Sequence, residues 1–305
     1  KEPEIDKKTP INPTEEDIEK LRQSLENIEN SKKNTTIEEV KVEEERIKDE
    51  KRAKELERIL KNKSSELKEQ LNAYINSLSE RVSISLDFSG KHYGYREDDL
   101  FIAASTVKVL MALAVIDNIN NGNLSKNQFI VYDKEKHYQR GAGIYQFEKN
   151  FKGDTLWNIV KNMIVHSDNI AKNMVQTSLP SGGISKFYKK LTGKTLYVTD
   201  TSYLSAKDNN IILNYLDKRR NKNLYNDIYI WLGNTENKTR IMSASKYNVY
   251  HKIGDLVYGG YVYSHDMALV KGKKNYTISI MVEGYDANEN YKIIEDIIRI
   301  IEKKI

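Results

Sequence analysis

The chain has 305 residues, enough for one large domain or two of ordinary size. It contains no cysteine, which excludes disulfides, thiol catalysis and cysteine-based zinc sites. Residues 1–60 hold 14 Lys/Arg and 18 Asp/Glu, a net charge of −4, so residues 61–305 carry +9 when the whole chain carries +5.

The first part of the chain, residues 1–62, is predicted to be a charged stalk. Three prolines interrupt residues 1–15, which we expect to be disordered. Residues 16–60 favour helix, either as a solvated helix or as a short coiled coil with a helical partner. The apolar residues that suggest a coiled coil have 3-4-3 spacing: Ile18, Leu21, Leu25 and Ile28. Because the chain starts with Lys1, we expect a signal peptide or membrane anchor upstream.

Residues 63–305 are predicted to form one folded domain. The stretch "RVSISLDF" (81–88) alternates like a strand, and "KHYGYRE" follows as its hairpin partner. Strand patterns return within 248–284, and a C-terminal helix ends the chain. Between these strands, helices are expected at 105–120, 155–165, 168–178, 183–191 and 206–217. This order predicts an α/β fold of the α+β kind, with one antiparallel sheet built from both chain ends and an all-helical lobe.

The basic surplus of this domain has two explanations, a lysine-rich soluble surface or attraction to an anionic polymer such as cell wall. No motif that reads DNA or RNA accompanies it, so we expect no nucleic-acid partner. No run of about 18 apolar residues is present, and none of the chain is expected to span a membrane. The five histidines form no zinc-binding pattern, so no metal is expected. His166 is interpreted as a helix-end or pocket-wall residue.

Ser-x-x-Lys occurs three times, about the number expected by chance in a chain so rich in both residues. The copies are Ser65–Lys68, Ser105–Lys108 and Ser243–Lys246. Only the second is apolar on both sides. Its two side chains would be neighbours on one helical face, with Ser105 at a helix N-terminus that favours developing negative charge. A lysine in an apolar pocket can be neutral and can take the serine proton.

Two further patterns are weak when each is taken alone. Ser167-Asp168-Asn169 separates two apolar helices, and all three residue types are ordinary helix-start residues. Lys252-Ile253-Gly254 lies in a strand pattern, where lysine side chains usually point to solvent. Their order after Ser105–Lys108 gives them more weight.

Together the three patterns resemble the serial signature of the penicillin-recognising serine enzymes, most closely the class A β-lactamase-like branch. The resemblance covers about residues 64–305. "TLWNIVKNMIVHSDNIAKN" is similar to that branch's helix and Ser-Asp-Asn loop, "QRGAGIY" to its preceding loop, and His265-Asp266 to the start of a strand. It implies a two-lobe β-lactamase-like fold and a serine acyl-enzyme hydrolase without a cofactor. The implied substrates are β-lactams or D-Ala-D-Ala-type wall peptides, and the implied location is extracytoplasmic.

The resemblance also implies roles for the residues that match. Ser105 would be the acylated nucleophile and Lys108 its base, and Ser167 would pass a proton to the leaving nitrogen. The backbone N–H groups of Ser105 and Asp255 would form the oxyanion hole.

The resemblance also implies a role in substrate binding for Asn169, Lys252, Gly254 and Asp255. Asn169 would bind the substrate's amide carbonyl, and Lys252 would attract its carboxylate. Gly254 and Asp255 follow on the same strand. Ile253 replaces the usual hydroxyl residue, which could weaken binding by about 1.5–3 kcal/mol. The negative charge of Asp255 could weaken carboxylate binding further.

The glutamate that clears the acyl-enzyme in class A β-lactamases has no counterpart. No glutamate occurs between Glu148 and Glu236, and Asp200 is the only acidic residue between Asp168 and Asp208. We therefore expect acylation with weak deacylation. The alternative is a catalytically silent relative that binds cell wall or a protein partner.

Overall fold

The structure is a computed structural model that describes residues 14–29, 37–198, 201–272 and 275–305. The chain forms two compact units, residues 1–69 with Lys304 and residues 70–303 with Ile305. The first unit holds α1 (Glu15–Glu29) and most of α2 (Ile37–Asn76). Helix is thus confirmed over much of 16–60. The predictions for residues 1–13, and for the side chains of Leu21, Leu25 and Ile28, fall outside the described residues.

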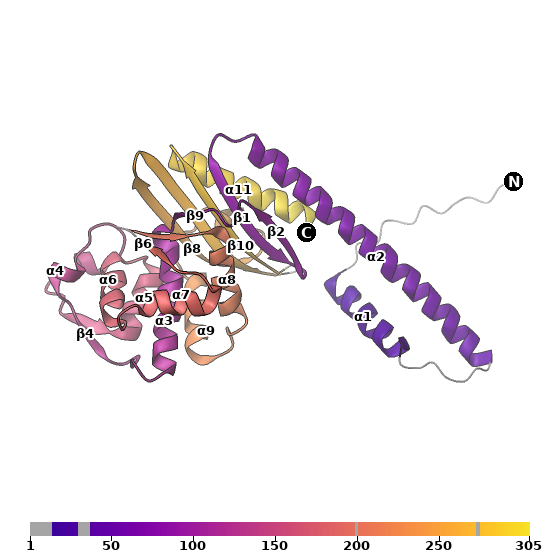
Figure 1. Cartoon of the computed structure of the whole chain (residues 1–305), viewed down its shortest axis with the longest axis horizontal. Helices are drawn as coiled ribbons and strands as arrows, with labels where there is room; N and C mark the ends of the chain where they lie inside the picture. The colour runs from indigo at the N-terminus through magenta and orange to yellow at the C-terminus, as the bar shows by residue number, and fades with distance from the viewer. Residues whose placement is uncertain (1–13, 30–36, 199–200, 273–274) are drawn as a thin grey trace. The chain divides into compact units, whose positions relative to one another are not determined.

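The second unit is built on a five-stranded antiparallel sheet with the order β2-β1-β10-β9-β8 (Figure 1). Its strands are β1 (Arg81–Phe88), β2 (Lys91–Tyr95), β8 (Asn248–Tyr258), β9 (Tyr261–Lys271) and β10 (Tyr276–Gly284). β1 pairs with β10 along its whole length, with Ile84 opposite Ile280. The two ends of the domain therefore meet inside one sheet, as predicted. β8 forms one edge of that sheet.

Helices cover the sheet. α11 (Ala287–Lys304) is amphipathic, and its buried side chains recur at helical spacing: Ile293, Ile294, Ile297, Ile298 and Ile301. Tyr276 on β10 donates a hydrogen bond to Glu302 of this helix at 2.8 Å. α8 (Ala206–Asp217) contacts β10 and β1. No helix in the described segments is both long and apolar enough to cross a bilayer.

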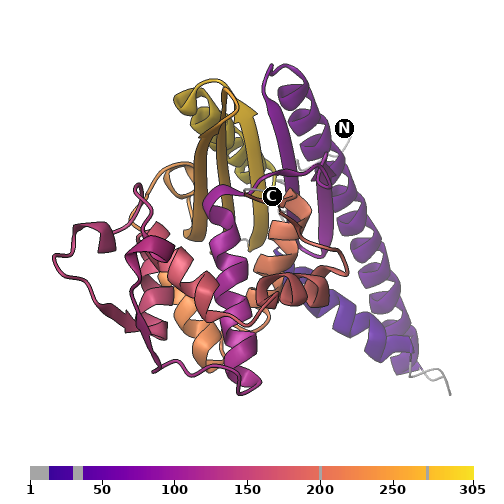
Figure 2. The same cartoon turned by 60° about the vertical axis from the view of Figure 1, so that its left-hand side comes forward.

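The helical lobe is arranged around α3 (Val107–Asn120), which is buried over most of its length (Figure 2). It contacts α5 (Leu156–Val165), α6 (Asn169–Ser178), α7 (Gly183–Thr192) and α9 (Asn223–Gly233). The predicted helices are confirmed to within about two residues, a normal uncertainty for helix ends. α9 was not predicted, because its stretch "NLYNDIYIWLG" is rich in the aromatic and β-branched residues that favour strands.

The remaining elements are short, and several border the site. They are η1 (Ala104–Thr106), η2 (Tyr145–Phe147), α4 (Lys134–His137), α10 (Ile241–Ala244), β3 (Phe101–Ile102), β4 (Phe129–Val131), β5 (Gly153–Thr155), β6 (Tyr197–Val198) and β7 (Ser202–Leu204). β3, β7 and β6 form a small sheet, in which β3 precedes the nucleophile turn η1 and β7 precedes α8.

Candidate active site

Ser105 lies in the 3₁₀ turn η1, directly before α3 rather than inside its first turn. The turn packs against β8. A Cβ at Gly254 would lie only 3.1 Å from the backbone N of Ser105 and 3.1 Å from the carbonyl O of Ala103, so glycine permits this close approach. Ala104 has φ +47°, an unusual value for a residue with a side chain. The nucleophile segment is therefore held in a strained conformation against the sheet edge.

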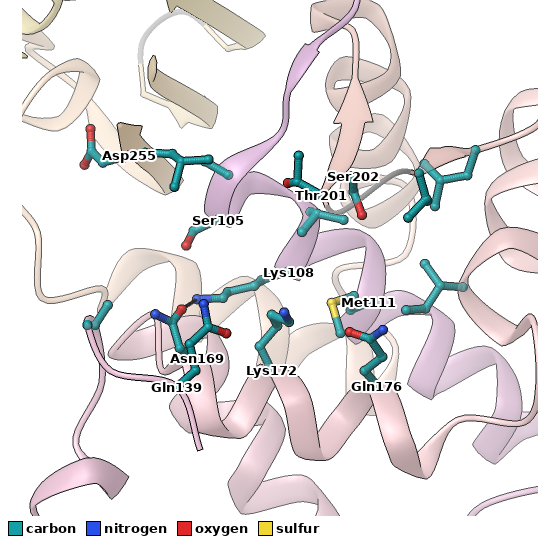
Figure 3. Close-up of a pocket in the computed structure, with 18 of the residues that line it drawn as sticks. Ser105, Lys108, Met111, Gln139, Asn169, Lys172, Gln176, Thr201, Ser202 and Asp255 are labelled. Atoms are coloured by element: carbon teal, nitrogen blue, oxygen red, sulfur yellow. Dashed lines mark hydrogen bonds between the residues drawn. The ribbon is translucent and has the colours of Figure 1, made fainter. Parts of the chain in front are cut away.

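A cavity of about 1100 Å³ opens beside Ser105. Of the predicted site residues, Ser105, Lys108, Asn169 and Asp255 line it (Figure 3). The backbone of Gly254 adjoins Ser105, as described above. The other two predicted residues, Ser167 and Lys252, join the site through hydrogen bonds.

A chain of hydrogen bonds links the two lysines through Ser167. Lys252 Nζ donates to Ser167 Oγ at 2.9 Å, and Lys108 Nζ lies 3.3 Å from the same oxygen. Lys108 Nζ also donates to the carbonyl O of Ser167 at 2.5 Å and to Asn169 Oδ1 at 2.9 Å. These contacts join residues from α3, the loop before α6, α6 and β8. The three sequence patterns therefore meet at one place.

The electrostatic setting favours a neutral Lys108. Its side chain is buried, with 1% of the residue exposed. Burial, followed by the positive charges of Lys252 and Lys172, holds the pKa of Lys108 well below its usual value. Burial also lowers the pKa of Lys252 to about 7, with Arg240 adding to the effect and Asp266 opposing it. A neutral Lys108 amine can accept the proton of a serine hydroxyl.

The Ser-Asp-Asn stretch is both a helix start and part of the site. Asp168 caps α6 by accepting a hydrogen bond from Ala171 N at 2.8 Å, and it accepts another from Tyr145 N at 2.8 Å. A Cβ at Gly143 would fall 2.2 Å from the Asp168 carboxyl carbon, so only glycine fits there. Ser167 has φ +53°. The cap and the loop before it thus hold Ser167 in a conformation that presents its hydroxyl to both lysines.

Lys252 departs from the usual behaviour of a strand lysine, because it points inward rather than to solvent. Only 2% of the residue is exposed. The edge strand β8 is covered here by η1 and α9, both of which contact it. The sequence pattern gave no sign of this covering, since α9 was not predicted.

Arg240 is a site residue that the sequence analysis missed. It is fully buried and has φ +59°. Its guanidinium donates to Asp255 Oδ2 at 2.5 Å and to the carbonyl O of His265 at 2.8 Å, and it lies 4.0 Å from the centroid of the Tyr291 ring. The hydroxyl of Tyr291 donates to Asp255 Oδ1 at 3.2 Å. The negative charge of Asp255 is therefore compensated, which offsets the repulsion that we expected from it.

No unpaired carboxylate is found among the described residues that line the cavity, since Asp255 is the single acidic one. Asp200 falls outside the described residues. His166 forms the end of α5 and lies 2.5 Å from Glu236 Oε1, which agrees with its interpretation as a helix-end residue. The cavity wall on α6 instead carries Lys172 and Gln176.

The sheet-and-helix fold and the arrangement of Ser105, Lys108, Ser167 and Lys252 define the class of penicillin-recognising serine hydrolases. Residues 56–305 match the model of the β-lactamase enzyme family, and the chain belongs to that family. The predicted family and fold are thus confirmed.

Curated relatives include two β-lactamases. ROB-1 of Haemophilus influenzae is 27% identical over 233 residues, 68% of this chain and 73% of ROB-1. SME-1 of Serratia marcescens is 25% identical over 134 residues, 43% of this chain and 45% of SME-1, so the match spans about half of that relative.

Solved structures share the fold at low sequence identity. PBP-A superposes with a TM-score of 0.71 at 17% identity, covering 78% of this chain and 95% of PBP-A. The extended-spectrum β-lactamase TLA-3 gives 0.71 at 18%, covering 78% and 98%. A PBP-A variant with a TM-score of 0.70 at 18% identity, covering 78% and 96%, has been solved as an acyl-enzyme complex with penicillin G.

Proposed function

We propose that this chain is an extracytoplasmic serine acyl-enzyme hydrolase that reacts through Ser105 and releases its acyl group slowly. Its substrates are β-lactams or D-Ala-D-Ala-type wall peptides. The main support is the hydrogen-bond chain from Lys252 through Ser167 to Lys108, beside Ser105. Membership of the β-lactamase family agrees with this chemistry.

In acylation, the neutral amine of Lys108 takes the Ser105 proton as Oγ attacks the substrate's carbonyl carbon. The N–H groups of Ser105 and Asp255 stabilise the negative charge that develops on the carbonyl oxygen. The carbon–nitrogen bond then breaks, and the proton passes from Lys108 through Ser167 to the leaving nitrogen. The product is an ester between Ser105 and the acyl group.

The charge of Lys252, behind Ser167 at the leaving-group end, favours a substrate carboxylate. Lys252 is bonded to Ser167 Oγ, so its charge lies beside the proton-transfer path. Arg240 lies near enough to lower the pKa of Lys252. A carboxylate bound here would favour the protonated form of Lys252.

Hydrolysis of the ester requires a base that removes a proton from water. The described cavity lining offers no unpaired carboxylate, because Asp255 is bonded to Arg240 and Tyr291. We therefore expect a long-lived acyl-enzyme, the behaviour of a penicillin-binding protein. The PBP-A variant complexed with penicillin G offers a parallel in a protein of the same fold.

A catalytically silent relative is the second candidate. It is favoured by Ile253, which supplies no hydroxyl for the substrate carboxylate. In that case, the charged helical N-terminal segment would bind the cell wall or a protein partner.

Intact-protein mass spectrometry over time, after mixing with benzylpenicillin, distinguishes these functions. We expect a persistent adduct on Ser105 that is absent in Ser105→Ala. A fleeting adduct with consumption of the drug would contradict slow release, and Asp200→Asn would then test Asp200 as the base. No adduct and no loss of drug would favour the silent relative.

A further inference from the structure

Lys172 is a partly buried cation in the cavity wall. It lies on α6, one turn after Asn169 and one turn before Gln176, and its side chain points into the cavity (Figure 3). Across the described segments, no ion pair or side-chain hydrogen bond is found for Lys172. The two other cavity-side lysines differ, because Lys108 and Lys252 each donate hydrogen bonds to Ser167.

An unpaired cation that is partly withdrawn from water is unfavourable unless a ligand compensates it. Burial lowers the pKa of Lys172, and its charge in turn lowers the pKa of Lys108. The lining residues labelled around Lys172 in Figure 3 are Lys108, Asn169, Met111, Gln176, Thr201 and Ser202, and none of them is anionic. A bound carboxylate would offset the cost, and the Gln176 amide and the two hydroxyls could donate hydrogen bonds to it.

The position of Lys172 along α6 indicates which part of the substrate would carry the bound carboxylate. Lys252 and Arg240 lie at the end that would take the carboxylate of the leaving group. Asn169 would bind the amide of the acyl group, and Lys172 lies about 4.5 Å farther along the helix axis at 1.5 Å per residue. An anion at Lys172 would therefore belong to the acyl part of the substrate.

We propose that Lys172, with Gln176, forms a subsite for a carboxylate on the acyl side of the scissile bond. This inference rests on the proposed function, because it places that bond at Ser105. The substrate class is an acyl donor with an acidic group close before the reacting carbonyl, such as a wall peptide with a free side-chain carboxylate or a penicillin with an anionic side chain.

A matched pair of penicillins tests the subsite. Carbenicillin is benzylpenicillin with one additional carboxylate on the side chain. In a Ser105→Ala background, which cannot be acylated, the dissociation constants of both compounds are measured by calorimetry. We expect carbenicillin to bind about tenfold more tightly, equal to ~1.4 kcal/mol. Adding Lys172→Met should abolish this preference, and Lys172→Arg should keep part of it.

Lys189→Met is the matched control, because Lys189 is exposed on α7, lies outside the cavity lining and carries the same charge. It should leave the preference unchanged. Equal binding of the two penicillins, a preference that survives Lys172→Met, or no binding of either would overturn the subsite.

The proposed function is judged separately, by adducts on native Ser105. A carbenicillin preference in the Ser105→Ala background, without any adduct on the native protein, would support the subsite and reject the acyl-enzyme function. Adducts from both compounds on the native protein, without a binding preference for carbenicillin, would support the acyl-enzyme function and reject the subsite.

Discussion

Replacing Arg240 by methionine is expected to lower both the stability of the protein and its rate of acylation. The guanidinium donates to Asp255 Oδ2 at 2.5 Å and to the carbonyl O of His265 at 2.8 Å, and it is fully buried. Methionine fills much of the same volume but donates nothing. The His265 carbonyl then loses a donor, and Asp255 keeps its charge without a counter-ion.

The expected magnitudes follow from these contacts. Removal of one partner of a buried ion pair destabilises a protein by about 3–5 kcal/mol. Because 39% of the Asp255 side chain is exposed, water offsets part of this loss, and we expect a decrease of about 3 kcal/mol in the free energy of unfolding. The free Asp255 carboxylate would repel the substrate's carboxylate, and two such charges at an assumed separation of about 6 Å repel by ~3 kcal/mol at an effective dielectric constant of ~20. After screening by salt, acylation should slow by about 10- to 100-fold.

Denaturant titration gives the stability, and mass spectrometry gives the second-order rate constant for acylation by benzylpenicillin. The double variant Arg240→Met/Asp255→Asn removes the stranded charge and should recover most of the lost rate. If the double variant acylates as slowly as Arg240→Met, the Asp255 charge is not the cause and the reasoning fails. If Arg240→Met does not fold, Asp255→Asn alone tests whether the Asp255 charge opposes substrate binding. This variant should acylate at least as fast as the native protein, and slower acylation would contradict the reasoning.

Lys108→Met should slow acylation by about 10³-fold, because the serine loses its base, and an unchanged rate in the same mass assay would remove Lys108 from the mechanism. The second-order rate constant for acylation should fall as pH rises through about 7, because Lys252 of the substrate-free protein then loses the charge that attracts the substrate carboxylate. Lys252→Arg should flatten this fall between about pH 6 and 9, whereas a flat native profile would contradict the assignment. Ser167→Gly should be about 1 kcal/mol more stable to heat than Ser167→Ala, because φ +53° strains any residue with a Cβ, although both variants lose acylation. Equal stabilities would show that no strain is stored there.

Local patterns predicted most of the scaffold because they depend on neighbouring residues. The strand predicted from "RVSISLDF" has the same bounds as β1. The helix predicted from the apolar residues after Ser105 agrees with α3 to within two residues. The order of the three motifs pointed to Ser105, Lys108, Ser167 and Lys252, which the structure places close together. Around Ser105 and Ser167, a short motif carries both the backbone signal and the functional group.

The missed features depend on contacts between residues far apart in the chain. Arg240 meets Asp255, His265 and Tyr291, which lie 15 to 51 positions later, and its backbone adopts a positive φ that no local signal announces. Lys252 is buried because other elements cover β8, and one of them, α9, has a strand-like composition. Periodicity cannot report such covering, since it describes one element at a time.

Lys172→Glu should affect acylation and deacylation in opposite directions. Its effect on acylation arises because Lys172 acts on Lys108 through its charge. A glutamate here replaces a cation that lowers the pKa of Lys108 by an anion that raises it, so less neutral amine is present at neutral pH. Acylation should therefore slow, and its rising limb with pH should move to higher pH. The new carboxylate lines the cavity and can accept a proton from water, so the adduct on Ser105 should shorten its lifetime. Lys172→Gln controls for loss of the cation alone: it should shift the pH profile less and leave the lifetime long. If the Glu and Gln variants keep adducts of equal lifetime, the lack of a free carboxylate in the described cavity lining is not what makes release slow.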